Sequence, residues 1–200
     1  MSADVWKKRK INRREASKTS PRIKFARRRA IEFRNKMSIN YVPIDILSIY
    51  EKNGWEFNWS DKVRGDSEAV TYHWNGFYAT YLPENFKINL PSRFRWTMGH
   101  EIGHIVLKHY EEFPLSFSNC SKVGKDLIKT LNREANLFCD EFLMPAKFIY
   151  ENYRMGFDYL KSSFEVSRQA LEIRLKDMGF NINGNYLELR WNYGRNGYAG

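Results

Sequence analysis

The sequence predicts an α+β fold: a mainly helical single domain with a small antiparallel sheet packed on the helices that carry its main motif, plus a C-terminal helix-turn-helix-like unit. Three observations predict it. Apolar residues recur at steps of three and four in several segments, as in amphipathic helices. Short aromatic and β-branched runs fill residues 55–89, as in strands. Residues 159–179 have the pattern of two short helices, the second of which is capped by Ser167.

Length and composition are those of a globular protein. The chain has 200 residues, of which 42% are hydrophobic and 16% aromatic, enough for one domain with a core. No apolar run approaches the 18 or so residues of a membrane helix, and the N-terminus lacks the hydrophobic segment of a signal peptide. Two cysteines, Cys120 and Cys139, are too few for a disulfide scaffold. We therefore expect a cytoplasmic protein without membrane contact.

The positive charge is concentrated at the N-terminus. The net charge is +10, yet residues 1–36 hold 14 Lys and Arg against three acidic residues, and the remaining chain is close to neutral. Residues 1–21 are therefore predicted to be a basic disordered tail. Weak nonspecific nucleic-acid contact through this tail is slightly favoured over a purely solubilising role.

The first half of the chain is predicted to contain two helices followed by strands. Residues 22–37 form an amphipathic helix, and a second helix is opened by Pro43 and closed at Gly54. The Asn75-Gly76 pair between two aromatic runs predicts a β-hairpin. Residues 86–89 (FKIN) are a candidate edge strand for pairing with an extended peptide.

The second half is predicted to be mostly helical. A helix capped by Ser92 carries the main motif, and others span residues 126–143 and 147–159, the latter interrupted at Gly156. The helix-turn-helix-like unit at 159–179 suits packing or protein recognition better than DNA reading, because no basic face emerges. The domain that carries the main motif is thus predicted to span residues 22–180, and residues 181–200 are predicted to form a C-terminal strand (YLELRW) and tail.

The main motif is H-E-x-x-H, formed by His100, Glu101 and His104. Residues four apart share one helix face, so both imidazoles can bind one zinc ion. Glu101 would then act as the general base that takes a proton from the zinc-bound water. Gly99 and Gly103 are costly inside a helix and imply that another element approaches closely. The alternative is a buried helix whose histidines only satisfy hydrogen bonds.

A hydrolytic zinc site needs a third protein ligand. On a continuous helix His109 would point away from the metal. Leu107 and Tyr110 stand where the extended metzincin pattern requires Gly and His, which excludes that class.

The next helix supplies other candidates. Glu134 borders the apolar stripe of residues 126–143 and is preferred. Glu141 lies almost in line with it and remains the fallback, Asp140 faces away, and Cys139 suits an ordinary small core position.

Two longer motifs carry a family resemblance. RFRWTMGHEIGHIVLKH at 93–109 and REANLFCDEFLMP at 133–145 resemble the R-F-T-x-A-H-E-x-G-H and E-A-N-x-F-A-x-x-L-L-M-P patterns of the ImmA/IrrE family of gluzincin-like zinc metallopeptidases. PIDI at 43–46 and FEVSRQALEIRLKDMG at 164–179 match more weakly. The resemblance implies His100, His104 and Glu134 as ligands of one Zn²⁺ and Glu101 as general base.

The resemblance also implies a substrate class. Family members cleave helix-turn-helix transcriptional repressors and so release genes of prophages, mobile elements or stress responses. The expected function is zinc-dependent endopeptidase activity on such a repressor. The alternatives are a non-proteolytic module that binds a repressor or DNA around a structural metal, and direct DNA binding by the basic tail and the helix-turn-helix-like unit.

Overall fold

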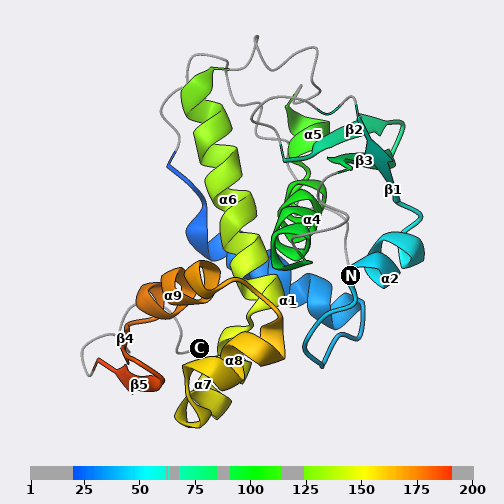
Figure 1. Cartoon of the computed structure of the whole chain (residues 1–200). Helices are drawn as coiled ribbons and strands as arrows, with labels where there is room; N and C mark the ends of the chain where they lie inside the picture. Colours follow the sequence, from blue (N-terminus) through cyan, green and yellow to red (C-terminus); the bar gives the residue numbers. More distant parts are fainter. Residues whose placement is uncertain (1–19, 62, 64–67, 85–90, 114–123, 191–200) are drawn as a thin grey trace.

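The computed structural model describes residues 20–61, 63, 68–84, 91–113 and 124–190. The basic tail up to residue 19, the candidate edge strand at 86–89, and Cys120 lie outside these residues. The described part is mainly helical with a small sheet (Figure 1), so the predicted fold class is confirmed. Its helices are α1 Ile23–Lys36, α2 Ile46–Lys52, α4 Pro91–Val106, α5 His109–Glu112, α6 Lys125–Leu143, α7 Ala146–Asn152, α8 Phe157–Phe164 and α9 Arg168–Asp177, with a 3₁₀ turn η3 at Tyr153–Met155.

Two helix starts differ from the prediction. Helix α2 begins at Ile46, because the Asp45 side chain accepts a hydrogen bond from Ser48 N and serves as the N-cap in place of Pro43. Helix α4 begins at Pro91, so Ser92 lies in its first turn and is not its cap. Proline suits the first turn of a helix because the amide hydrogen it lacks would have no intrahelical partner there.

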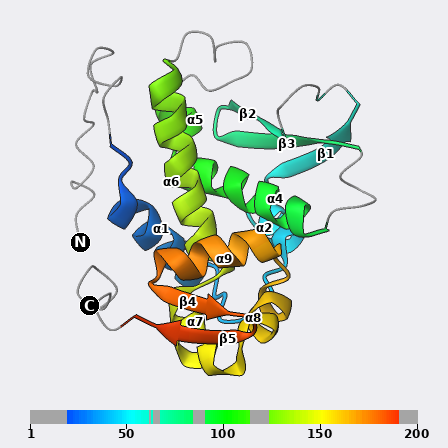
Figure 2. The same ribbon diagram turned by 60° about the vertical axis from the view of Figure 1, so that its left-hand side comes forward.

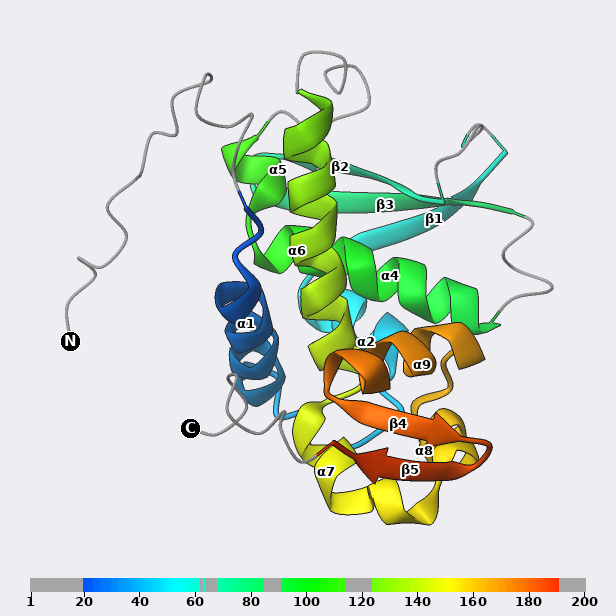
Figure 3. The same ribbon diagram turned by 90° about the vertical axis from the view of Figure 1, so that its left-hand side faces the viewer.

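Helices α4 and α6 cross at the centre of the fold, and α1 packs along α6 (Figure 3). The two glycines of α4 permit this approach. A Cβ on Gly103 would lie 2.9 Å from the carbonyl oxygen of Ala135, and one on Gly99 would lie 2.9 Å from Cys139 Sγ. The expected close approach to this helix face is therefore confirmed, with α6 as the neighbour.

The sheet is mixed, not antiparallel as predicted. Strands β1 (Glu56–Ser60), β2 (Val70–Trp74) and β3 (Phe77–Pro83) lie in the order β1-β3-β2. The β2–β3 hairpin turns at Asn75-Gly76 as expected, but β1 pairs in parallel with β3 and not with β2, its neighbour along the chain. The predicted pattern identified the strands but could not show which of them would be central. The sheet lies beside α4 (Figure 3).

The C-terminal region follows the end of α6. Helices α8 and α9 form the predicted two-helix unit, and the Ser167 side chain accepts from Ala170 N as its N-cap. Beyond them the chain forms an antiparallel hairpin of β4 (Phe180–Asn183) and β5 (Tyr186–Leu189) (Figure 2). The sequence predicted β5 and missed β4. Among the residues described, none of the helices is both long enough and apolar enough to cross a membrane.

Candidate metal centre

Helix α4 presents the three residues of the H-E-x-x-H motif together. His104 and Glu101 are buried and His100 is partly exposed. The Nε2 atoms of His100 and His104 lie 3.1 Å apart. Two imidazoles on one tetrahedral zinc, each about 2.0–2.1 Å from the ion, have nitrogens separated by roughly 3.3 Å. The histidine pair therefore has the spacing of two ligands of one ion.

Asn136 on α6 orients His100. Its side-chain oxygen lies 2.8 Å from His100 Nδ1. An amide oxygen only accepts hydrogen bonds, so Nδ1 carries the proton and Nε2 carries the lone pair. A ligating histidine generally donates its other N–H in this way. The donor set of the pair thus fits a zinc ion.

The third predicted ligand, Glu134, has other partners. Its carboxylate accepts from the backbone N and the guanidinium of Arg22, at distances of 2.7–3.1 Å, and lies 3.2 Å from His109 Nε2. A carboxylate offers about four acceptor positions, and these contacts use both of its oxygens. In the described part of the chain, no set of three or more His, Cys, Asp or Glu side chains is placed to hold one metal ion. The structure therefore brings two predicted ligands together and leaves Glu134 as a prediction.

The charge state of Glu134 is nevertheless clear. Burial alone would raise the pKa of this carboxyl, but hydrogen bonds from His109 and Arg22 outweigh burial and lower the pKa to about 2. Glu134 is consequently an anion at neutral pH, the form in which a carboxylate binds metal.

His109 lies in the cluster, contrary to the prediction from a continuous helix. Helix α4 ends at Val106, and Lys108 adopts a left-handed backbone conformation with φ of 64°. The chain turns there, so that His109 Nδ1 lies 3.0 Å from His104 Nδ1. Because Nδ1 and Nε2 are on different sides of the His104 ring, His109 contacts the side remote from His100. Sequence spacing could not reveal this contact, since nothing in it marks the break at Lys108.

Burial keeps both inner imidazoles neutral. It is the main cause that lowers the pKa of His104 well below its ordinary value, with the neighbouring histidines adding to it. Burial likewise lowers the pKa of His109, against the pull of Glu134. Neutral imidazole is the form that binds metal.

Glu101 is held by two hydroxyl groups. Thr71 Oγ1 and Tyr110 OH lie 2.6 and 2.5 Å from Glu101 Oε2, and the described hydrogen bonds to this carboxylate all end on that oxygen. Burial, and next the charge of Glu101, raise the pKa of the Tyr110 phenol well above its ordinary value, so the phenol stays protonated as a donor. This arrangement leaves Oε1 for another proton.

Thr71 is the first of three hydroxyl groups joined by hydrogen bonds. Thr71 Oγ1 lies 2.9 Å from Thr80 Oγ1, which lies 3.0 Å from Tyr50 OH. Since Thr71 donates to Glu101, it accepts from Thr80, which in turn accepts from Tyr50. Burial raises the pKa of Tyr50, which keeps this phenol protonated too. Alternation along β2 and β3 could have placed the threonines inward but not opposite Glu101.

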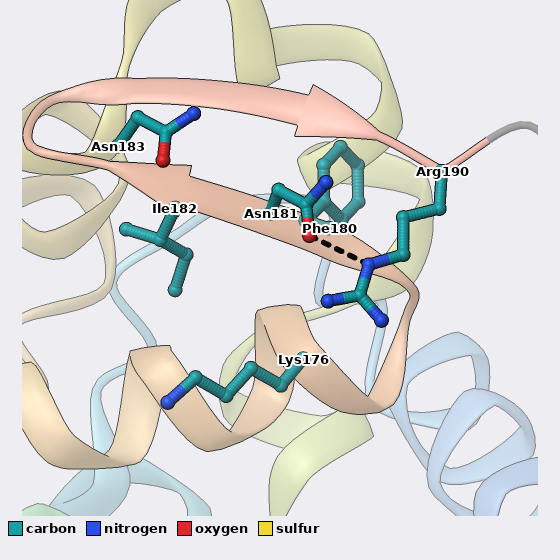
Figure 4. Close-up of a pocket in the computed structure, with 6 residues that line it drawn as sticks. All are labelled: Lys176, Phe180, Asn181, Ile182, Asn183 and Arg190. Atoms are coloured by element: carbon teal, nitrogen blue, oxygen red, sulfur yellow. Dashed lines mark hydrogen bonds between the residues drawn. The ribbon is translucent and has the colours of Figure 1, made fainter.

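The other α6 candidates are structural. Glu141 pairs with the buried guanidinium of Arg174 and accepts from Ala146 N. Cys139 is a fully buried core residue against Gly99. A surface hollow lined by Lys176, Phe180, Asn181, Ile182, Asn183 and Arg190 lies between α9 and the β4–β5 hairpin, with Arg190 bonded to Asn181 (Figure 4). None of its lining residues belongs to the histidine cluster.

Comparison with known proteins relates the part of the chain that contains this site to a peptidase family. Residues 89–176 match the sequence model of peptidase family M78, described as the IrrE N-terminal-like domain. Curated proteins gave no match. Among solved structures, a transcriptional regulator from Mycobacterium tuberculosis is similar in fold, with a TM-score of 0.54 and 11% sequence identity over 76% of this chain.

That regulator is much longer, since the match covers 46% of it and the present chain therefore spans about half its length. At this identity the likeness concerns the fold alone. The family match is more specific, because it covers both motifs from which the resemblance was deduced. The match supports the resemblance to the ImmA/IrrE family of peptidases and locates it at residues 89–176.

Proposed function

We propose that this protein is a zinc-dependent endopeptidase that hydrolyses a peptide bond in a helix-turn-helix transcriptional repressor and so relieves repression of a prophage, mobile element or stress regulon. His100, His104 and Glu134 would be the zinc ligands and Glu101 the general base. The observation that carries the proposal is the pair of Nε2 atoms 3.1 Å apart beside a carboxylate with one committed oxygen.

Neighbouring residues orient the metal ligands and the general base. Asn136 sets the His100 tautomer, so that Nε2 is available for a metal. Thr71 and Tyr110 fix Oε2 of Glu101, so that Oε1 can take a proton from water and pass it to the leaving nitrogen. A zinc ion at the histidines would supply the Lewis acid that polarises the scissile carbonyl and acidifies water.

The proposal for the substrate rests on the family. Its match supports a peptidase, and members of the family act on repressors. Protein recognition by the C-terminal α8–α9 unit would fit a protein substrate. Contact of the basic tail with nucleic acid would keep the enzyme near the repressor's operator, and that part of the proposal rests on charge alone.

Glu101→Gln is the decisive variant. Glutamine keeps the size of the side chain and an oxygen for the hydroxyl donors, but it is not a base. We expect zinc binding to be retained and cleavage of a candidate repressor to fall by at least about 10³-fold, the middle of the range typical of general bases. Cleavage is followed by mass spectrometry of the repressor fragments, with and without a chelator.

The matched control is Glu112→Gln, which removes an exposed carboxylate of α5. This variant should cleave like the wild type. Equal activity in Glu101→Gln and the wild type would contradict the catalytic assignment.

A second function is favoured by one observation. Arg22 and His109 together engage both oxygens of Glu134, an arrangement that suits a non-proteolytic module in which a metal held by the histidine pair only joins helices. Such a module would sequester a repressor or DNA without cutting it. A tight complex in which the repressor stays intact after long incubation with zinc would support this alternative.

A further inference from the structure

His109 is a buried histidine with a partner on each nitrogen. Its side chain is 0% exposed. Nδ1 lies 3.0 Å from His104 Nδ1, and Nε2 lies 3.2 Å from Glu134 Oε2. A side chain that only filled space at this position would need neither contact.

We propose that His109 is a positioning residue: it accepts a hydrogen bond from His104 Nδ1 and donates one to Glu134, and thereby keeps His104 Nε2 unprotonated and facing His100. The expected effect of His109 on metal binding rests on the proposed function. The tautomer that it assigns to His104 is a property of the chain alone.

The direction of the chain follows from its far end. A carboxylate without a proton only accepts, so His109 Nε2 must donate to Glu134. A neutral imidazole has one donor and one acceptor, so His109 Nδ1 accepts, and His104 Nδ1 is the donor in the 3.0 Å contact. His104 Nε2 is then left with its lone pair.

The same result follows independently for His100, whose Nδ1 donates to Asn136. Two lone pairs therefore face each other across 3.1 Å. This contact cannot be a hydrogen bond between the two rings, because neither Nε2 carries a proton. It is the arrangement that a cation between the rings would stabilise.

Arg22 fixes the far end of the chain. Its backbone N and its guanidinium Nε and Nη2 hold Glu134 at 2.8, 3.0 and 2.7 Å. The connected groups come from four places: the residue before α1, then α6, α5 and α4. An apolar side chain at 109 would remove the acceptor that His109 provides for His104 Nδ1, and only Asn132 and His100 would remain as side-chain partners of His104. The His104 proton could then move to Nε2, where it would occupy the position of the metal.

The tautomer is tested on the metal-free full-length chain by two-bond ¹H–¹⁵N correlation of the imidazoles at neutral pH. We expect His104 of the wild type to carry its proton on Nδ1. His104 should shift toward the Nε2-protonated form in His109→Phe and return in His109→Gln, because the glutamine oxygen can accept from His104 while its NH₂ donates to Glu134. His73→Phe is the control, since His73 stacks on Tyr78 in the sheet.

A wild-type His104 protonated on Nε2 would overturn the inference. That measurement needs no substitution, so it decides the question even where His109→Phe does not fold. Folding of each variant is checked by circular dichroism.

Zinc affinity, measured by competition with a chromogenic chelator, tests the consequence. Partners that orient metal ligands typically contribute 10–100-fold to affinity, and we expect a loss of that size in His109→Phe, recovery in His109→Gln and no change in His73→Phe. Wild-type affinity in His109→Phe would overturn the inference and leave the proposed function intact. A wild type that binds no zinc but shows the assigned His104 tautomer would overturn the proposed function and leave the positioning chain intact.

Discussion

Two glutamates of α6, Glu134 and Glu141, both pair with an arginine, yet they lie in different surroundings. They are seven residues apart, and such positions lie almost in line on a helix. The partner of Glu141 is Arg174, which is fully buried, whereas the partner of Glu134 is Arg22, whose side chain is 42% exposed. Glu134 also reaches the histidine cluster through His109.

The surroundings separate a structural pair from a functional one. Arg174 also donates to the carbonyl of Met144, and the second oxygen of Glu141 accepts from Ala146 N. These bonds join α9 to the end of α6 and the start of α7 within the core. Glu134 instead lies between a partner that water can replace and a histidine that touches a candidate metal ligand. Of the two carboxylates, Glu134 is the one whose contacts can change.

Removing Arg174 should have the largest effect on stability. Arg174→Ala leaves Glu141 buried without its counter-charge, and breaking a buried ion pair in this way costs about 3–5 kcal/mol. Urea unfolding followed by circular dichroism measures the loss. Arg168→Ala is the control on the same helix, because Arg168 is exposed and pairs with Glu172 at the surface, where a pair contributes at most about 1 kcal/mol. Equal stability of the two variants would remove the distinction between the pairs.

Asp140 shows what happens to a neighbouring carboxyl without such a pair. It is buried, and its Oδ1 has no hydrogen-bond partner among the described residues. Burial raises its pKa from 3.8 to about 6; Asp177 adds to this rise, while the charges of Arg174, Arg27 and Arg133 oppose it. The folded chain therefore binds this proton more tightly than the unfolded chain.

The sign of the pH dependence follows from linkage. Below about pH 4 the carboxyl is protonated in both states, and as the pH rises to about 6 only the unfolded state loses the proton, so stability falls across this window. One pKa unit corresponds to about 1.4 kcal/mol, which sets the penalty at neutral pH on the order of 3 kcal/mol. Asp140→Asn should be more stable than the wild type at pH 7 by up to about that amount, less what the attraction to Arg174 contributed.

Urea unfolding at pH 4, 5, 6 and 7 tests this expectation. The advantage of Asp140→Asn should grow with pH between 4 and 6 and then level off. A difference that is independent of pH would show that the pKa of Asp140 is not raised in the folded protein.

The same comparison shows how far sequence reasoning reaches. Local patterns located the helices, the Asn75-Gly76 hairpin and the motif, because helical periodicity, turn residues and ligand spacing are short-range properties. The pattern on α6 favoured Glu134 and kept Glu141 as the fallback, since their positions on the helix are nearly equivalent. What separates them is contact with Arg22 and Arg174, 112 and 33 residues away along the chain.

Other misses have the same origin. The parallel pairing of β1 with β3 depends on which strand the core places in the middle. The role of His109 depends on one left-handed residue, Lys108, at which the helix ends. Neither feature leaves a periodic signal in the sequence.

Arg22→Ala should have the smallest effect on stability and the most informative effect on metal binding. Because the Arg22 side chain is 42% exposed, water can replace it, and we expect a loss of about 1 kcal/mol. The substitution removes the guanidinium from both oxygens of Glu134, while the backbone N of residue 22 still donates to Oε1 and His109 still holds Oε2. If Glu134 is the third ligand, zinc affinity should therefore rise several-fold relative to Arg28→Ala, the control that removes an exposed charge of α1 paired with Glu32. A fall in zinc affinity would instead identify Glu134 as the anchor of His109 only and assign the third ligand to another group.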